Sequence, residues 1–569
     1  MLRERNFPMA PRKSEGRSFS AREAVAEALV VALRGLGLEV DPSRVMLERP
    51  NDPSHGDLST NVALVEGGRA GMNPRELASR IAGEVDLDKD FIGRVEVAGP
   101  GFVNFTFAER YLKDQVALIN EMGPSYGECD LGEGTRLQIE FVSANPTGPL
   151  VVVSARSAAV GSALVNIMRK AGYDVEAEYY INDAGAQVRK LGLSTMVRFR
   201  QRLGEDVPFP EDGYPGGYLA DVAAGIPEEK GRELLAKDGA EAAEAFGSIA
   251  LERMIEWIQS DLEKFGVRFD NYFRESQLHG EGGEVWKTLD LMKEKGVVYE
   301  DEGALWFRST DFGDEKDRVL VRSEGTPTYF LADAAYHLDK YRRGFDHVID
   351  IFGPDHHGHI DRLKAAAEVF GAGRDWLDVL VVQWVRLIEE GRQVRMSKRG
   401  GEFETLADLV DDVGADASKF FFLMRKTNAH LDFNLTLARK QSDENPVYYV
   451  QYAHARICSV ISYARDEGVD FPRDSSCVEL LREPEAMELI RNLVIFPQLI
   501  EGAAETREPH RLTTYGQQLA QSFHRFYHIC RIVSSDRKLS EARLLLAEAT
   551  RIVLAETLRL LGVSSPERM

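Results

Sequence analysis

Apolar residues recur along the first hundred positions of the chain with two different periods. From about residue 20 they return at every third to fourth position, which predicts an amphipathic helix. A second helix is expected over 74–81, and the runs 94–97 and 102–107 have the composition of strands joined by a Gly/Pro turn. These elements predict a small α+β unit of about 110 residues. The polar, basic residues 1–20 show no hydrophobic period.

The middle of the chain alternates between short apolar runs and helical periods. An apolar run over 137–142 is followed by a turn with Pro and Gly, a helical pattern over 154–171 and another apolar run over 175–180. This order is that of a βαβ unit, the building block of a parallel sheet. Free backbone N–H groups and the positive helix dipole meet where the strand turns into the helix, so we expect a phosphate-binding turn there. A strand-to-helix turn without a ligand is the alternative.

The remaining patterns complete an α/β domain and add a helical one. A helix-rich insertion is expected around 190–265. Later strands are expected at 269–273, 304–307, 348–352 and 379–385. From about residue 438 we find only long helical periods, at 447–464, 486–501, 512–533 and 540–561. The fold class is therefore α/β, a doubly wound parallel-sheet (Rossmann-like) domain with a small N-terminal α+β domain and a C-terminal helical bundle. The expected domains are 1–128, 129–437 and 438–569.

Composition adds a cellular context. The chain has 569 residues, 44% hydrophobic and 28% charged, which is typical of a soluble globular protein of roughly three to four domains. It has no uncharged apolar run of the ~18 residues that a membrane span needs, and its basic beginning lacks the apolar core of a secretory signal. The four cysteines form no CxxC pair, which argues against structural zinc or disulfides and fits a reducing compartment. With a net charge of −22, local basic patches would have to hold any nucleic acid.

Two segments near the ends of predicted strands could bind a nucleotide. One is basic and continues into two glycines, and its amines could reach the oxygens of a departing pyrophosphate; it consists of Arg395, Met396, Ser397, Lys398 and Arg399. By itself such a loop is more often a solvated turn. The other contains Asp355, His356 and His359 and follows the run 348–352, where ligands bind in parallel sheets. We favour a nucleotide over a metal there, because no carboxylate or cysteine has matching spacing.

Acidic residues interrupt several apolar elements. Glu140 lies inside the first strand of the βαβ unit, Glu275 follows the run 269–273, and Asp333 lies four residues after Tyr329, on the same face of a helix. Buried acids are costly unless they are paired. If these acids converge on one pocket, they suit a cationic ligand such as a guanidinium. Separate surface acids or internal salt bridges are the alternative.

A stretch near the C-terminus interleaves basic and aromatic residues. Over 523–531 a helical spacing places His524, His528 and Arg531 on one face and three other side chains, two of them aromatic, on a neighbouring face. Such a surface suits stacking on unpaired bases. A packed helix with a solvated basic face explains the pattern equally well.

Taken in this order, the segments resemble the bacterial type of arginyl-tRNA synthetase, a class I aminoacyl-tRNA synthetase, over nearly the whole chain. Residues 140–150 are similar to the approach to the family's HIGH signature, and 395–399 to its KMSKS loop. The most specific match, Asn-Pro-Val-Tyr-Tyr-Val-Gln-Tyr-Ala-His-Ala-Arg at 445–456, resembles the start of the anticodon-binding domain. The N-terminal unit, with His-Gly-Asp at 55–57, resembles the domain that touches the tRNA elbow.

The resemblance implies a ligase that activates L-arginine with ATP, carried as a complex with Mg²⁺, and transfers it to the 3′ end of tRNA-Arg. It implies a cytoplasmic monomer with no structural metal and no DNA or membrane partner. It assigns the arginine pocket to Glu140, Asn145, Glu275, Tyr329 and Asp333. ATP is assigned to Pro146, Thr147, Gly148, Val153, Asp355, His356, His359, Met396 and Ser397, and catalysis to Ser154, Arg395, Lys398 and Arg399. Candidates for contact with tRNA are Tyr448, Gln451, Tyr452, Arg456 and Arg531.

The HIGH signature itself is degenerate. The family commonly has Leu-His-(Val/Ile)-Gly-His where this chain has Leu-Val-Val-Val-Ser at 150–154. Both histidines, which stabilise charge on the α-phosphate, are missing, and Val153 replaces the glycine that leaves room for adenine. An uncompensated loss of one transition-state donor costs ~3–4 kcal/mol. Either backbone N–H groups, Lys398 and the histidines at 356–359 compensate, which we favour, or the chain is a non-catalytic tRNA-binding or regulatory paralogue. A class I enzyme with another substrate is a weaker alternative.

Overall fold

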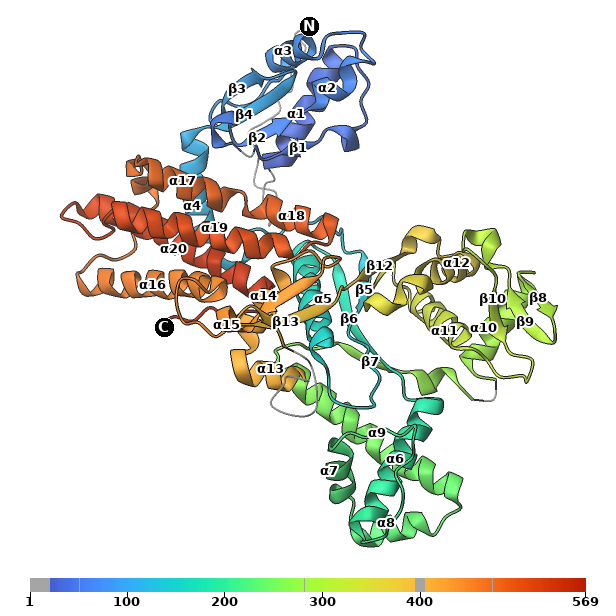
Figure 1. Ribbon diagram of the computed structural model, residues 1–569. Helices are drawn as coiled ribbons and strands as arrows, with labels where there is room; N and C mark the ends of the chain where they lie inside the picture. The colour runs from blue at the N-terminus through green and yellow to red at the C-terminus, as the bar shows by residue number, and fades with distance from the viewer. Residues whose placement is uncertain (1–20, 51, 281, 395–404, 473) are drawn as a thin grey trace.

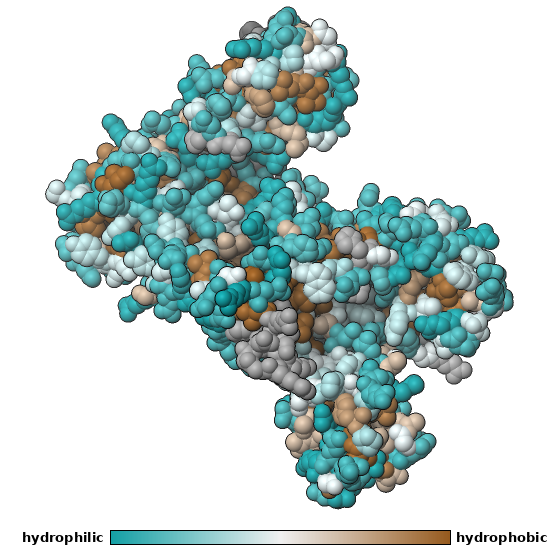
Figure 2. All heavy atoms as spheres, in the orientation of Figure 1, coloured by the Kyte–Doolittle hydropathy of each residue, from teal (hydrophilic) through white to brown (hydrophobic). Residues whose placement is uncertain are grey.

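The computed structural model describes residues 21–569 except 51, 281, 395–404 and 473 (Figure 1). The expected polar beginning, 1–20, and the basic segment 395–399 therefore lie outside the described residues. Four lobes surround a central parallel sheet, and Figure 2 shows a mostly hydrophilic surface with scattered apolar patches. None of the helices in the described ranges is long and apolar enough to cross a membrane.

The N-terminal lobe is an antiparallel sheet with helices, as its periods predict. The sheet order is β1-β2-β4-β3. The helices are α1 (Ala21–Gly35), α2 (Val62–Gly67) and α3 (Pro74–Glu84), and the strands are β1 (Leu47–Glu48), β2 (Leu58–Thr60), β3 (Ile92–Ala98) and β4 (Phe102–Phe107). Asn73 caps α3 by accepting a hydrogen bond from the Arg75 amide, and Pro74 occupies the first helical position. Helix α4 (Glu109–Met122) leads from this lobe into contact with the C-terminal bundle.

The central sheet has five parallel strands in the order β12-β11-β5-β6-β7. They are β5 (Arg136–Glu140), β6 (Asp174–Ile181), β7 (Asn271–Arg274), β11 (His347–Phe352) and β12 (Leu377–Val381). The chain proceeds from β5 to one side through β6 and β7, and later to the other side through β11 and β12. The carboxyl ends of β5 and β11 therefore flank the topological switch point, where ligands bind in such sheets.

Two further lobes are formed by segments of the chain that lie between strands of this sheet. The first consists of α6 (Ala186–Arg202), α7 (Tyr218–Gly225), α8 (Glu228–Leu235) and α9 (Gly239–Lys264). The second contains α10 (Glu284–Glu294), α11 (Tyr329–Arg342), α12 (Ile360–Phe370) and an antiparallel sheet of β8 (Val298–Asp301), β9 (Ala304–Phe307) and β10 (Arg318–Val321). The strand expected at 304–307 thus belongs to this separate sheet and not to the parallel one.

A small sheet and five long helices complete the chain. The sheet joins β13 (Val385–Glu389), β14 (Arg392–Gln393) and β15 (Leu431–Asn434), and the short helices beside it are α13 (Leu406–Val413), α14 (Ala415–Leu423) and α15 (Leu435–Ala438). The bundle consists of α16 (Pro446–Asp466), α17 (Pro484–Val494), α18 (Phe496–Thr506), α19 (His510–Ile529) and α20 (Arg537–Leu560).

Several expected boundaries were wrong. The run 379–385 spans two strands of different sheets, β12 and β13. The helix expected at 486–501 is two helices, and Pro497 lies in the first turn of the second, where it cannot continue the preceding hydrogen-bond ladder. The first strand of the βαβ unit ends at Glu140, because Val142 and Ser143 have positive φ angles of 69° and 38°.

Candidate active site

The turn between β5 and α5 (Val152–Lys170) is fixed by hydrogen bonds to three elements, α5, β6 and α7. The Val142 amide donates to Ser157 Oγ at 3.2 Å, and the Tyr180 amide donates to Ser143 Oγ at 3.1 Å. From the insertion lobe, Tyr218 Oη donates to the Thr147 carbonyl at 2.5 Å. Gly148 leaves the space for this contact, since a Cβ there would lie 3.1 Å from the Tyr218 hydroxyl. The strained backbone of the turn is thereby held in one conformation.

Helix α5 begins without a side-chain cap. Its N-cap residue, Val151, is 45% exposed, and no acidic residue lies in the first turn. The Val151 carbonyl accepts from the amides of Ser154 and Ala155, whereas the amides of Val152 and Val153 have no helical carbonyl behind them. Val153 and Ser154 are half-buried. The valine-rich start of α5 therefore offers backbone donors and one hydroxyl to an anion, but no imidazole.

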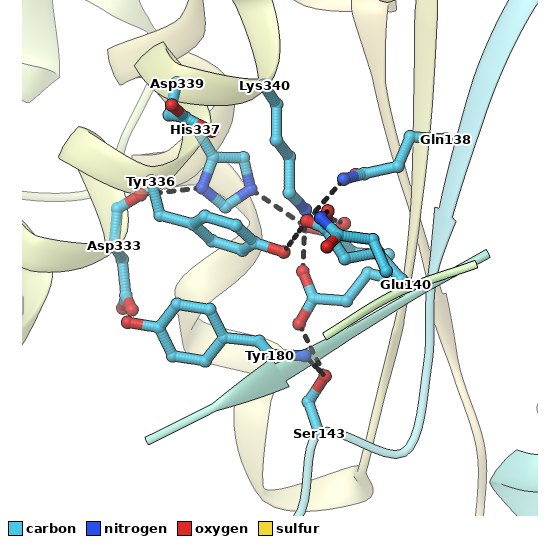
Figure 3. A network of polar contacts seen from close by, with 12 residues as sticks. Gln138, Glu140, Ser143, Tyr180, Asp333, Tyr336, His337, Asp339 and Lys340 are labelled. Atoms are coloured by element: carbon cyan, nitrogen blue, oxygen red, sulfur yellow. Dashed lines mark hydrogen bonds and ion pairs between the residues drawn. The ribbon is translucent and has the colours of Figure 1, made fainter. Parts of the chain in front are cut away.

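A cluster of acidic side chains, called the acidic pocket below, lies beside this turn on and around β5, β6 and α11 (Figure 3). Glu140 is buried, and Lys340 Nζ lies 2.6 Å from its Oε2, while Ser143 Oγ donates to Oε1 at 2.8 Å. Burial raises the pKa of Glu140, and the Lys340 ammonium opposes that shift. The expectation of an internal salt bridge therefore holds for Glu140, and Lys340 neutralises part of its charge.

Two further acids approach the same pocket. Asp333 is half-buried on α11, and Glu275 is buried at the start of a 3-10 helix with Oε1 3.0 Å from His279 Nε2. Burial raises the pKa of Asp333 to about 7, and the nearby Glu275 and Glu140 add to the rise. Figure 3 shows the Tyr180 hydroxyl directed toward Asp333. The three acids singled out in the sequence are thus brought together around a site with an excess of negative charge.

A buried charge network supports this pocket, and sequence reasoning missed it. Lys340 Nζ also lies 2.8 Å from Asp350 Oδ1, and His337 Nε2 lies 2.8 Å from Asp350 Oδ2. Although burial favours neutral Asp350, Lys340 and His337 lower its pKa to about 2. Behind it, the fully buried Glu178 accepts from Arg343 Nη1 at 2.6 Å. The available signal was the spacing of polar residues 333, 337 and 340 on one face of the helix.

The other expected residues of the site are placed less completely. Asn145 is exposed on the turn, Tyr329 is 56% exposed one helical turn from Asp333, and Asp355 is exposed after β11. Within the described residues no group of three or more His, Cys, Asp or Glu side chains could hold a metal ion. The basic segment 395–399 is not described, but Thr405 pairs with Val151 in a β-bridge, and the Leu406 amide donates to the Leu150 carbonyl at 2.8 Å.

Aromatic and basic side chains line a groove of about 710 Å³ in the helical bundle. Tyr452 lines this groove, and its ring stacks on that of Tyr448, outside the lining, with centroids 6.2 Å apart; the Arg456 guanidinium lies 4.6 Å from the centroid of the Tyr527 ring. Arg531 lines the same groove, but α19 ends at Ile529, so Arg531 does not share a helical face with His524 as expected. Burial lowers the pKa of His524 to about 4 and Arg456 contributes, so that ring is neutral.

Gln451 differs from the other candidates for tRNA contact. Its side chain is buried, and Nε2 donates to Asp416 Oδ2 at 2.9 Å and to the Ser564 carbonyl at 3.0 Å. It thereby joins α16 to α14 and to the C-terminal residues. The remaining candidates are the half-buried Tyr448, Tyr452 and Arg456 and the exposed Arg531.

Comparison with known proteins identifies two modules and close relatives. Residues 21–107 match the arginyl tRNA synthetase N terminal domain, and 450–569 match the DALR anticodon binding domain. The chain is 45% identical over 554 residues to the arginine–tRNA ligase of Desulforamulus reducens, covering 96% of this chain and 99% of that one. It is 45% identical over 558 residues to that of Heliobacterium modesticaldum, with coverages of 96% and 99%. The Thermus thermophilus arginyl-tRNA synthetase structure matches with a TM-score of 0.77 at 21% identity, covering 97% of this chain and 100% of that one.

Proposed function

The chain belongs to the arginyl-tRNA synthetase family, and we propose that it joins L-arginine to the 3′ end of tRNA-Arg in two steps at the carboxyl ends of β5 and β11. In the first step the arginine carboxylate attacks the α-phosphorus of ATP, and pyrophosphate leaves. In the second a ribose hydroxyl of the terminal nucleotide attacks the carbonyl carbon of the adenylate, and AMP leaves. The observation that carries this proposal is the convergence of three acids beside an uncapped helix N-terminus.

The arginine side chain would enter the acidic pocket. A guanidinium presents five donors in one plane and pairs bidentately with a carboxylate. Asp333 is the best partner, because Lys340 and Ser143 already occupy both oxygens of Glu140. Glu140 and Glu275 then stabilise the cation through the field of the pocket. Tyr329 and Asn145 complete its exposed rim toward the phosphate-binding turn.

ATP would lie over the first turn of α5, with Mg²⁺ as its counter-ion. Thr147, Gly148 and Val153 would form the surface beneath the nucleotide, and the buried Pro146 would support it. Ser154 and the first amides of α5 stabilise charge on the α-phosphate. The remaining roles fall on segments that flank the switch point. We assign the ribose and adenine side to Asp355, His356 and His359, and the departing pyrophosphate to Arg395, Met396, Ser397, Lys398 and Arg399.

tRNA-Arg would span the N-terminal lobe and the helical bundle. The family matches at both ends of the chain support assigning the elbow to domain 1–128 and the anticodon to domain 438–569, with catalysis in 129–437. In the bundle, Tyr448, Tyr452, Arg456 and Arg531 offer stacking surfaces and cations to unpaired bases. Because the chain has a net charge of −22, tRNA binding would depend on local basic groups that contact its phosphates. The affinity for tRNA should therefore fall as the salt concentration rises. We propose a cytoplasmic monomer.

Charging of tRNA-Arg with arginine, lysine or citrulline tests this function. Citrulline has the shape of arginine without its charge, so the acidic pocket should reject it, and lysine cannot form the bidentate pair. Arginine alone should be charged efficiently. Equal charging of citrulline, or no charging with arginine, would refute the proposed substrate.

A further inference from the structure

Arg156, in the second turn of α5, is a fully buried cation held only by backbone among the described residues. Its Nη1 donates to the carbonyls of Gln383 and Ala429, both at 2.8 Å, and its Nη2 donates to the Lys426 carbonyl at 3.0 Å. Burial lowers its pKa to about 10. Burying a charge without an anionic partner is costly, so the arrangement needs a reason beyond packing.

The three carbonyls belong to two segments that are themselves joined. Gln383 follows β12, and Lys426 and Ala429 precede β15. The Gln383 amide donates to the Thr427 carbonyl at 3.1 Å, and the Leu431 amide donates to the Trp384 carbonyl at 3.1 Å. From this point β13 and β15 run in parallel, and β13 continues through β14 to residue 394. Arg156 therefore joins α5 to the strand pair that leads to the basic segment.

The opposite flank of that segment is also fixed near the start of α5. Thr405 forms a bridge with Val151, and the Leu406 amide donates to the Leu150 carbonyl. Both described flanks of 395–404 are thus positioned relative to one helix. The bridge fixes the flank at 405, and Arg156 fixes the strand pair at the other flank.

We propose that Arg156 is a positioning residue for adenylate formation, which sets the distance between the first turn of α5 and the strand pair β13 and β15. This inference rests on the proposed function. Arg156 contacts none of the residues of the acidic pocket, so it should control the rate of activation and not the affinity for arginine. A displacement of ~1 Å between reacting groups can cost about 10²-fold in rate.

The test compares Arg156→Met and Arg156→Lys with Arg202→Met. Arg202 is a control for the hydrogen bonds alone, because its Nη1 also donates to two carbonyls at 2.8 Å, those of Ala223 and Ile226, but it is exposed and lies within the insertion lobe. Arginine-dependent ATP–pyrophosphate exchange gives kcat and KM, calorimetry gives the arginine Kd, and thermal unfolding reports stability. The Met variant should lose about 10²-fold in kcat with the arginine Kd within about twofold, and Arg202→Met should keep its kcat.

The Lys variant separates charge from geometry. An ammonium keeps the charge but lacks the planar fork, so Arg156→Lys should also lose kcat, and guanidinium added to an Arg156→Ala variant should restore part of it. The positioning role would be overturned by an unchanged kcat in both substitutions, or by parallel losses of kcat, arginine affinity and thermal stability. The proposed function would still stand in either case if the unaltered chain shows normal exchange. No exchange by the unaltered chain would overturn both.

Discussion

Lys340 Nζ lies 2.6 Å from Glu140 Oε2, so a buried ammonium already occupies part of the pocket that is proposed to take a guanidinium. The same ammonium lies 2.8 Å from Asp350 Oδ1. The pocket therefore contains a buried cation, while Asp333 and Glu275 make no ion pair with it. This arrangement leaves Asp333 as the carboxylate that is free to pair with a substrate.

Replacing Asp333 by Asn should weaken arginine binding. A hydrogen bond to a charged group is worth about 1.5–3 kcal/mol, so the arginine KM should rise about 10–100-fold. Asp339→Asn is a matched control, because Asp339 lies on the same helix and pairs with Arg343 at 2.9 Å. Steady-state exchange kinetics measure both variants. An unchanged arginine KM in Asp333→Asn would remove Asp333 from the pocket.

Arginine affinity should depend on pH near neutrality. The pKa of Asp333 is raised to about 7, so the free enzyme holds that carboxyl protonated below this pH, and a neutral carboxyl pairs poorly with a guanidinium. The Kd should therefore fall as pH rises from about 6 to 8 and level off above, with proton release on binding below pH 7. Calorimetry in buffers of different ionisation enthalpy measures this. The dependence should vanish in Asp333→Asn; a pH profile shared by both proteins points to another group.

Removing Lys340 should destabilise the fold. Lys340→Met leaves Glu140 and Asp350 buried together without their common cation, and breaking one partner of a buried pair costs about 3–5 kcal/mol. Adding Glu140→Gln should recover part of the loss, because one uncompensated charge is removed. Urea unfolding of both variants gives the free energies. A double variant less stable than the single one would show that Lys340 is not the counter-ion of Glu140.

Loss of the ion pair between Asp57 and Arg491 should change the affinity for tRNA and leave the affinity for arginine unchanged. Asp57, from the His-Gly-Asp motif, accepts from the Phe107 amide at 2.8 Å and from Arg491 Nε, on α17, at 3.0 Å. Gly56 has a φ of 92°, and a Cβ there would lie 2.6 Å from the Phe105 carbonyl oxygen. The motif therefore joins the N-terminal lobe to the bundle.

Arg491→Met should lower tRNA affinity several-fold, since it removes one of the contacts that hold together the two lobes proposed to bind tRNA. Filter binding measures tRNA affinity, and calorimetry should give an unchanged arginine Kd. Arg525→Met is the control, because Arg525 forms an exposed pair with Glu488 at 3.0 Å within the bundle. Equal tRNA affinities in both variants would show that the contact between the lobes is not needed for binding.

Periodicity predicted most of the fold, because buried elements must repeat their apolar residues. It failed where local conformation departs from the pattern, as at Val142 and Ser143, whose φ angles end β5 early. It also failed where a polar side chain is buried and forms its hydrogen bonds within the protein. Gln451 lies in the sequence context of a tRNA-contacting residue, but its side chain is hydrogen-bonded to Asp416 and Ser564. Only the folded structure brings these groups together.

The acids of the pocket could be found from the sequence, because a charge within an apolar run demands a partner. Their partner could not. Lys340 reaches Glu140 across 200 positions of the chain, and no local pattern encodes that pairing. The same holds for Arg156, whose three carbonyl partners lie 227 to 273 residues away.

Arginine-dependent ATP–pyrophosphate exchange, run with and without tRNA-Arg, tests most directly whether the valine-rich start of α5 supports activation. The expected result is exchange that requires arginine, with a rise of less than about 10²–10³-fold when Val151→His, Val153→Gly and Ser154→His are introduced together. A rise in the exchange rate below the ~10²–10³-fold that one transition-state donor contributes means that backbone donors and the other cations replace the missing imidazoles. No exchange by the unaltered chain at any enzyme concentration, with tRNA-Arg still bound, would contradict an active ligase.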